Sequence, residues 1–220
     1  MAADSAIGLG DFKATYLENY IPLSSSSDVY AGTRSILPQT YLEYAREDLE
    51  DGRESRNLIN AVGNAKRAFH LQVELLCDAF AFKVVNRQRH PNFGILLDYL
   101  RNCGVVSPNI LGRLNKTRNK VEHEYIVPSE EAVEDYADIV ELFLMATKDL
   151  LDRFPTYIEY ELMEDDALDY SLNLPQVFKA EIRMTSGGIV LSSREEEKTL
   201  APADADYFVW LSAIIRNYKI

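Results

Sequence analysis

The stretch SRNLINAVGNAKRAFHLQVELLCDAFAFKV, residues 55–84, carries the clearest structural signal in this chain of 220 residues. Apolar side chains recur through it every three or four residues, which is the spacing of one face of an α-helix. That face consists of Leu58, Val62, Ala65, Phe69, Val73, Leu76 and Phe80. The pattern predicts one long amphipathic helix that other helices must cover.

Helical patterns continue on both sides of this stretch. They predict helices over residues 38–50, 92–102, 108 to about 124, and 129 to about 154. The apolar face of the last one is Val133, Tyr136, Val140, Phe143, Leu144, Thr147 and Leu150. Two helix starts are marked by Ser107-Pro108 and Pro128-Ser129, and Gly104 is a left-handed stop. Short connections between such helices indicate antiparallel neighbours in a bundle.

The pattern changes after Pro155. Residues 176–184 alternate between apolar and polar side chains, Ser186-Gly187-Gly188 is a turn, and residues 189–193 read as the returning strand. Residues 204–218 are again helical in pattern, with Phe208, Leu211, Ile214 and Ile215 as the core face. The tail is therefore expected to be a small β-hairpin plus helix.

The first 37 residues are poorly patterned. Phe12, Tyr16 and Tyr20 suggest a short helix, which Pro22 and the serine run at residues 24–27 would end. The sequence as a whole predicts a mainly α fold, an antiparallel helical bundle with a small C-terminal β-hairpin plus helix. Its expected segments are an N-terminal extension or linker (1–37), the bundle (38–155) and a small α+β appendage (156–220).

Composition narrows the class of protein. Hydrophobic residues make up 47% of the chain, enough to bury a core, and no apolar run reaches the ~18 residues of a membrane span. Cys77 and Cys103 lie in apolar helical surroundings and are expected to be buried, reduced thiols of a cytoplasmic protein. No zinc-binding spacing and no phosphate-binding glycine loop occurs, so neither a metal nor a cofactor is expected.

Charge is unevenly distributed. The chain carries −12 overall, but residues 83–120 hold eight basic residues and one acid, a net charge of +7 that leaves −19 for the rest. A basic stripe on an acidic body can bind phosphates locally. Clustered charges are also common on ordinary helix surfaces, so the stripe alone does not decide between these readings. Its candidate RNA contacts are Lys83, Arg87, Arg89, Arg113, Lys116 and Lys120.

The string RNKVEH, residues 118–123, ends this stripe and is followed by Tyr125. Metal-free RNA cleavage needs a base for the 2′-hydroxyl proton, which a histidine can provide, and a fixed positive charge on the phosphate, which an arginine can provide. On a helix, Asn119 and His123 are neighbours at i and i+4. Arg118 and His123 are five residues apart, so they converge only if the arginine reaches round or a second subunit completes the pocket.

This string resembles the motif of the HEPN family, a helical domain found in prokaryotic RNases of toxin–antitoxin and anti-phage systems. The family pattern is an Arg, four to six residues and a His, commonly with Asn, Asp or His after the Arg, and Arg118, Asn119 and His123 match it. Members paired with a minimal nucleotidyltransferase antitoxin extend the pattern to Arg-x4-His-x-Tyr, which Tyr125 also matches. The resemblance spans about residues 39–154.

The resemblance implies a metal-independent endoribonuclease of toxin–antitoxin or anti-phage defence type, with Arg118, Asn119 and His123 as catalytic residues. It also implies a homodimer with the motif at the interface. Tyr125 would be the site of a regulatory modification, made by a nucleotidyltransferase-like antitoxin partner. Asn64 or Lys66 on the long helix would support the site.

Two alternatives remain open from the sequence. Glu122 and Glu124 beside the histidine, and the acidic charge of the whole chain, favour a non-catalytic HEPN-like module that binds RNA, a nucleotide or a protein. The other alternative is that the string is accidental and the protein is an unrelated scaffold. The polar stripe of Asn64, Lys66, Arg67 and His70 is more typical of a solvated helix face than of a surface that supports the motif.

Overall fold

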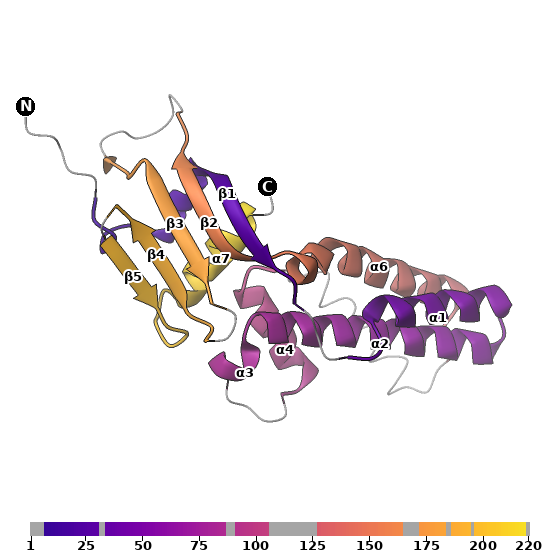
Figure 1. Cartoon of the computed structure of the whole chain (residues 1–220). Coiled ribbons are helices and arrows are strands. Elements are labelled where there is room, and N and C mark those ends of the chain that lie inside the picture. Colours follow the sequence, from indigo (N-terminus) through magenta and orange to yellow (C-terminus); the bar gives the residue numbers. More distant parts are fainter. Residues whose placement is uncertain are drawn as a thin grey trace, which may run out of the picture.

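A helical arm and a five-stranded sheet make up the computed structural model of this chain (Figure 1). The structure describes residues 7–30, 34–86, 91–105, 127–164, 172–183, 186–194 and 196–218. The arm extends away from one edge of the sheet, and the chain enters it after the first strand and leaves it before the second.

Three long helices form the helical arm: α1 (Pro38–Asp51), α2 (Ser55–Ala79) and α6 (Glu130–Asp152). They pack against one another along their lengths (Figure 1), and every residue predicted for the apolar faces of α2 and α6 is buried. Thr147 belongs to that face because its hydroxyl accepts from the buried Gln72 amide at 2.8 Å and donates to the Phe143 carbonyl at 2.7 Å. Both polar groups are satisfied between the helices.

The helix ends follow the capping signals in the sequence. The Ser129 hydroxyl accepts the backbone N–H three residues further on, at 3.3 Å, and the Asn92 side chain does the same at 3.1 Å to begin α4 (Phe93–Asn102). Gly104 has a φ of 79°, which confirms the left-handed stop. The helix expected from residue 108 to about 124 lies outside the described residues.

The predicted long helix is interrupted near its C-terminal end. Ala81 adopts a left-handed φ of 57°, and the short helix α3 (Phe82–Val85) replaces the continuation that the periodicity predicted to residue 84. The buried hydroxyl of Tyr99 donates to the carbonyl of Phe80 at this break. A tertiary hydrogen bond therefore stabilises the turn, and periodicity does not reveal such a bond.

The sheet is antiparallel throughout, with the strands in chain order from edge to edge. The strands are β1 (Tyr20–Asp28), β2 (Phe154–Leu162), β3 (Val177–Ile182), β4 (Ile189–Ser193) and β5 (Glu196–Leu200). The predicted hairpin is β3 and β4, and its register pairs Ala180 with Leu191.

One face of the sheet is covered by helix α7 (Tyr207–Tyr218) and the 3₁₀ helix η1 (Ala14–Asn19). Trp210 of α7 stacks with Phe178 of β3, with ring centroids 5.8 Å apart, and Phe12 lies 4.9 Å from the same Phe178 ring. Such aromatic burial supplies much of the apolar area that stabilises a small sheet.

The prediction of a mainly α fold was wrong. The structure is mixed, because a five-stranded antiparallel sheet accompanies the helices and takes strands from both ends of the chain. Of the three strands outside the predicted hairpin, β1 and β5 lack an alternating pattern: β1 is exposed at every position after Tyr20, and β5 is an edge strand that begins with Glu196 and Glu197. Their strand conformation comes from pairing with a neighbour rather than from their own side chains.

The expectation of a linker in the N-terminal segment was also wrong for the serine run. Residues 24–27 lie in β1 and pair with β2, and the preceding Leu9, Phe12 and Leu17 belong to the buried core. The Tyr20 hydroxyl donates to the Pro175 carbonyl at 2.7 Å and ties this segment to the C-terminal part of the chain. How the three expected segments divide into folding units stays a prediction.

The contact between Gly104, just after α4, and α7 generates a stability prediction. A Cβ at Gly104 would lie 2.8 Å from the Ser212 hydroxyl and 2.9 Å from the Ser212 Cα, and the φ of 79° disfavours any other residue. Gly104→Ala should therefore lower the free energy of unfolding by about 2–4 kcal/mol, measured by urea denaturation.

Gly10→Ala is the matched control, because a Cβ there meets nothing within 4 Å. Its free energy of unfolding should stay within about 1 kcal/mol of the wild-type value. Equal effects of the two substitutions would contradict the close contact between Gly104 and Ser212.

Candidate functional site

The predicted catalytic motif lies outside the described residues. This holds for Arg118, Asn119, His123 and Tyr125, and for five of the candidate RNA contacts, Arg87, Arg89, Arg113, Lys116 and Lys120. The motif occupies the connection between the end of α4 and the start of α6. The structure describes three of the predicted site residues: Asn64, Lys66 and Lys83.

A hollow of about 430 Å³ lies over the polar side of α2. Lys66, Arg67 and His70 line it from the helix, and Arg34 lines it from the segment that precedes α1. The predicted polar stripe therefore contributes three basic or imidazole side chains to one hollow. Arg34 also enters it, although no pattern in the sequence marks a loop arginine as part of this site.

Arg34 is partly neutralised in the hollow. Its guanidinium lies 2.9 Å from the carboxylate of Glu74, and both side chains are more than two-fifths exposed. Such a solvated ion pair contributes little free energy and exchanges readily for another anion. The hollow therefore offers three cationic groups with one acid among them.

Asn64 connects α1 to α2. Its amide donates to the Asp48 carboxylate of α1 at 2.8 Å, and its side-chain oxygen accepts from the Arg67 guanidinium at 2.8 Å. Asn64 thus holds Arg67 in place and fixes one helix against the other. These contacts give it a structural role beyond the predicted support of the motif.

His70 is held by an aromatic neighbour. Its imidazole stacks on the ring of Phe93, the first residue of α4, with centroids 3.9 Å apart and an angle of 14° between the planes. The half-buried imidazole therefore has a fixed orientation at the edge of the hollow. The stripe is not simply a solvated helix face, because two of its members make specific tertiary contacts.

Lys83 lies in a different part of the structure. Its ammonium group is 2.9 Å from Asp78, near the C-terminal end of α2. Asp78 is twelve residues beyond Lys66, about 18 Å along the helix axis. Arg101, another member of the basic stripe, pairs with Asp98 at 2.9 Å. The described part of the stripe is thus matched by acids and does not join the hollow.

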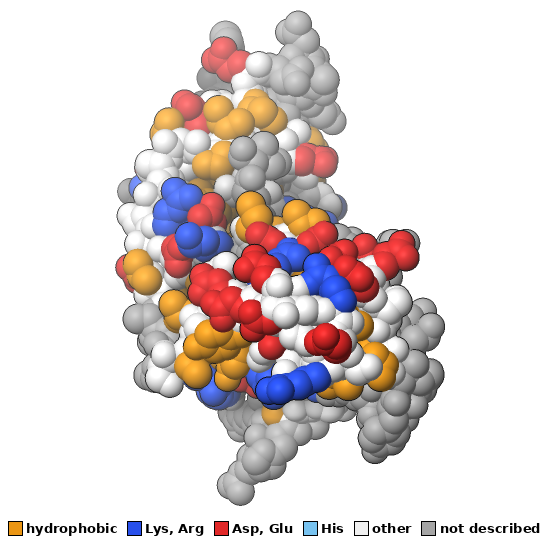
Figure 2. Space-filling model, turned by 90° about the vertical axis from the view of Figure 1, so that its right-hand side faces the viewer, with side chains coloured by type: hydrophobic (Ala, Val, Ile, Leu, Met, Phe, Trp, Pro, Cys, Tyr) orange, Lys and Arg blue, Asp and Glu red, His pale blue; other side chains and the backbone are white. Residues whose placement is uncertain are grey.

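The outer half of the helical arm is strongly acidic. Residues 38–58 and 129–141 contain twelve acids and three arginines. Arg46 contacts Asp138 and Glu141, each at 2.6 Å, and Arg53 pairs with Glu130 across the same end. Figure 2 looks onto this end of the arm and shows acidic side chains outnumbering basic ones. A polyanion would be repelled here, so any RNA contact must lie elsewhere.

Both cysteines are buried and unpaired, as the sequence predicts. Burial raises the pKa of the Cys77 thiol and of the Cys103 thiol well above the ordinary value. Neither thiol is therefore suited to nucleophilic attack.

Within the residues that the structure describes, no three His, Cys, Asp or Glu side chains gather in a way that could hold a metal ion. No helix in the same ranges is both long and apolar enough to cross a membrane.

Comparison with known proteins adds no relative. No protein-family model, no curated protein and no solved structure matches this chain. The resemblance to the HEPN family therefore rests on the residues of the motif.

The contacts of Asn64 generate a prediction. Asn64→Ala removes a hydrogen bond to the half-buried Asp48 carboxylate and should lower the free energy of unfolding by about 1–2 kcal/mol. The control is Asn60→Ala, at an exposed position of α2 one turn earlier. This substitution brings the same gain in helix propensity, and the Asn60 side chain makes no hydrogen bond with the described residues. Equal urea midpoints for the two variants would show that Asn64 does not tie α1 to α2.

Proposed function

We propose that this chain is a metal-independent endoribonuclease of the toxin–antitoxin or anti-phage type. The observation that carries the proposal is the string of Arg118, Asn119, His123 and Tyr125. It stands between α4 and α6, in the part of the chain that is otherwise helical. The string is flanked by helices of the arm in sequence: α1 and α2 precede it and α6 follows it, with α1 antiparallel to both and α2 parallel to α6.

The proposed reaction is attack of a ribose 2′-hydroxyl on the adjacent phosphorus. His123 takes the hydroxyl proton while the new oxygen–phosphorus bond forms, and Arg118 stabilises the extra negative charge on the phosphate oxygens. The bond to the 5′-oxygen then breaks, and that oxygen leaves with a proton. The products are a 2′,3′-cyclic phosphate and a 5′-hydroxyl, and Asn119 orients the imidazole or the phosphate.

The cationic hollow on α2 is the proposed contact for RNA phosphates next to the cleavage point. Lys66 and Arg67 present charge there, and Arg34 can exchange its exposed Glu74 partner for a phosphate. The acidic outer arm would keep RNA away from the other end of the helices. This separation of charge allows local binding by a chain of net charge −12.

The proposed active form is a homodimer. Arg118 and His123 are five residues apart, which places them well apart in angle on one helix. A second copy would bring the arginine of one subunit near the histidine of the other. Tyr125 is the proposed modification site for a nucleotidyltransferase-like antitoxin, whose addition of adenylate would block the same pocket.

A second candidate function is a non-catalytic module that binds RNA, a nucleotide or a protein. Glu122 and Glu124 favour it, since carboxylates on both sides of His123 can compete for Arg118. The acidic outer arm favours it also, because such a surface suits a basic protein partner.

Cleavage of RNA in EDTA separates the two functions. The wild type should cut, because no step of the proposed reaction uses a metal ion. Arg118→Ala and His123→Ala should each lose about 10²–10⁴ in rate while keeping the helical content of the wild type. Arg56→Ala, an exposed arginine at the start of α2, is the control and should cut normally. Equal rates for all four proteins would exclude the assigned site, and RNA binding without cleavage would favour the second function.

The hollow makes a separate prediction about RNA affinity. The double variant Lys66→Ala, Arg67→Ala should weaken RNA binding. It should also reduce the magnitude of the slope of log K against log salt concentration by about 1–2, because fewer phosphate contacts form and fewer counterions are released from the RNA. Fluorescence anisotropy with an RNA oligonucleotide measures both quantities. An unchanged salt slope would show that RNA does not use the hollow.

A further inference from the structure

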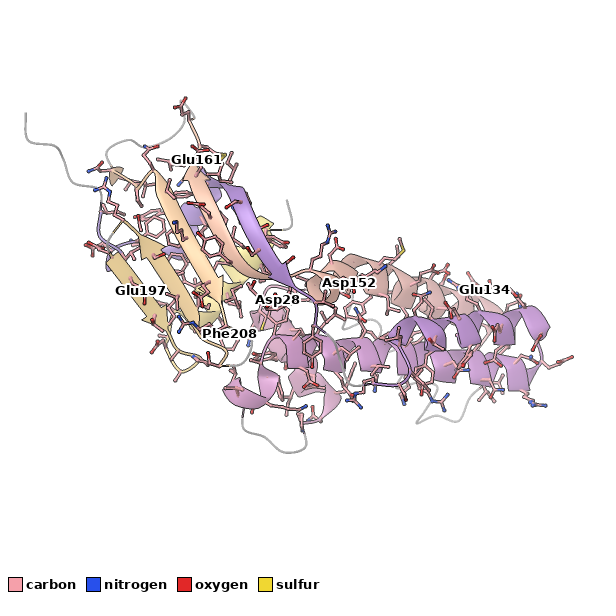
Figure 3. All side chains as sticks on the ribbon, in the orientation of Figure 1. Asp28, Glu134, Asp152, Glu161, Glu197 and Phe208 are labelled. Carbon is pink, nitrogen blue, oxygen red and sulfur yellow. The ribbon has the colours of Figure 1, made fainter. Side chains whose placement is uncertain are left out.

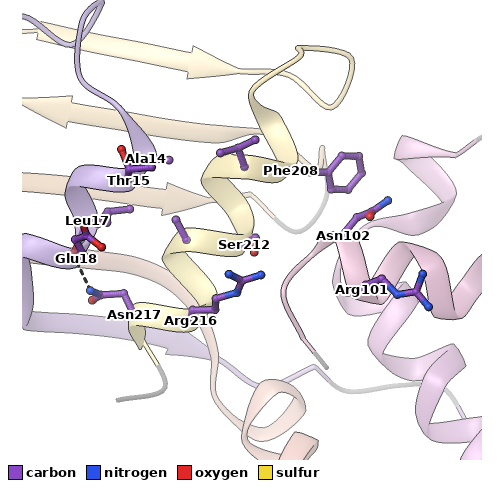
Figure 4. A pocket seen from close by; sticks show the side chains of 12 residues that line it. Ala14, Thr15, Leu17, Glu18, Arg101, Asn102, Phe208, Ser212, Arg216 and Asn217 are labelled. Atoms are coloured by element: carbon purple, nitrogen blue, oxygen red, sulfur yellow. Dashed lines mark hydrogen bonds between the residues drawn. The ribbon is translucent and has the colours of Figure 1, made fainter. Parts of the chain in front are cut away.

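A second cleft lies where the helical part meets the sheet, at a place that the proposed nuclease site does not use. It has a volume of about 620 Å³, and its walls come from η1, the end of α4 and α7 (Figure 4). Ligand sites are commonly clefts of about 300–1,000 Å³ at such junctions. The volume therefore suits a small organic ligand.

Two contacts hold the walls of this cleft together. Gly104, just after α4, lies directly against Ser212 of α7, so closely that a Cβ would collide. On the other side, the Asn217 amide of α7 donates to the carbonyls of Leu17 and Tyr20, at 2.9 and 3.1 Å. The three walls are thus fixed relative to one another, and the cleft is formed before any ligand arrives.

The inner surface of the cleft is largely apolar. Leu17 and Ala14 are buried, and Phe208 is held at the edge by ring contacts with Tyr99 and Tyr207 at 5.8 and 5.0 Å. The sequence predicted Phe208 as a core residue of the last helix, but it is only half-buried because it faces this cleft. A planar group could pack against such a surface.

Positive charge enters the cleft from two elements. Arg216 extends from α7 toward α4 in Figure 4, and it makes no ion pair with any residue that the structure describes. Arg101 lines the α4 side, and among the described residues it pairs with Asp98 alone, in an exposed pair three residues apart on the same helix. Glu18 is the one acid among the described lining residues, and it is not paired with either arginine. A guanidinium group favours a phosphate, which it can bind through two parallel hydrogen bonds.

Uncharged polar groups complete the lining. Asn102 and Ser212 face the cleft between the arginines and the apolar wall, and Thr15 adds a hydroxyl from η1. These groups can hydrogen-bond a sugar or a base. The cleft thus combines an anion site, an apolar wall and neutral donors and acceptors within a volume of mononucleotide size.

We propose that the cleft between η1, α4 and α7 binds a nucleoside monophosphate, with Arg216 on the phosphate and the base against Phe208. The assignment is independent of the proposed nuclease function, since none of the described residues that line the cleft belongs to the motif. A small ligand is the proposed occupant, because the volume of about 620 Å³ lies in the range of small-molecule sites.

The test is calorimetric titration of the full chain with the four ribonucleoside 5′-monophosphates, the matching nucleosides and inorganic phosphate. At least one monophosphate should bind, and its nucleoside and inorganic phosphate should each bind about tenfold more weakly or worse, because each lacks half of the recognised groups. Arg216→Gln should raise the Kd of that monophosphate about tenfold or more. Phe208→Leu should raise it by a smaller factor.

Arg153→Gln is the control variant. Arg153 is an exposed arginine at the end of α6 that pairs with Asp149 and does not line the cleft, so its Kd should equal that of the wild type. Absence of binding by all four monophosphates at millimolar concentration would overturn the proposal. Equal Kd values for the Arg216→Gln and Arg153→Gln variants would overturn it too. The proposal would also fail if an RNA oligonucleotide bound through Arg216 while none of the monophosphates bound.

Discussion

The pairing of β1 with β2 is the constraint on which the rest of the structure depends. These strands are neighbours in an antiparallel sheet, yet the whole helical arm lies between them in the sequence. Asp28 pairs with Phe154 at the point where the chain leaves the sheet and returns to it, and the backbone N–H of Tyr30 donates to the Leu151 carbonyl at 2.7 Å. Figure 3 shows Asp28 and Asp152 at this junction and Glu134 toward the far end of the arm. The two ends of the inserted helices are therefore held together, and the loop-closure cost of this long insertion is offset by the sheet.

This arrangement also separates the candidate functional surfaces. The outer arm is acidic, the hollow on α2 collects Lys66, Arg67 and Arg34, and the cleft beside α7 collects Arg216 and Arg101. The hollow is built within residues 34–74, whereas the cleft joins elements distant in sequence and depends on the contact of Gly104 with α7. The proposed nuclease motif lies between α4 and α6 in the sequence. It therefore belongs to the insertion between β1 and β2, whose two ends the strand pairing holds together.

The sequence predicts those parts of the fold in which apolar side chains recur with the period of a helix or a strand. The apolar faces of α2 and α6 repeat every three or four residues, and β3 and β4 flank a Ser-Gly-Gly turn. The serines of β1 have no such signal, because the strand is exposed and takes its register from β2. The same holds for the candidate sites: the stripe on α2 was visible, but Arg34 and Arg216 join their clefts only through tertiary packing. The motif from Arg118 to Tyr125 stays a prediction, as it lies outside the described residues.

The central claim is that RNA is cut by its own 2′-hydroxyl, and the most direct measurement replaces that group. The cleavage position of the wild-type protein would first be mapped on an RNA oligonucleotide in EDTA. The same oligonucleotide would then be made with a single 2′-deoxyribose on the 5′ side of the mapped bond. The account predicts that cleavage at that bond is abolished, and that the unmodified RNA yields a 2′,3′-cyclic phosphate end. Cleavage of the deoxy-substituted bond at the rate of the unmodified one would contradict it.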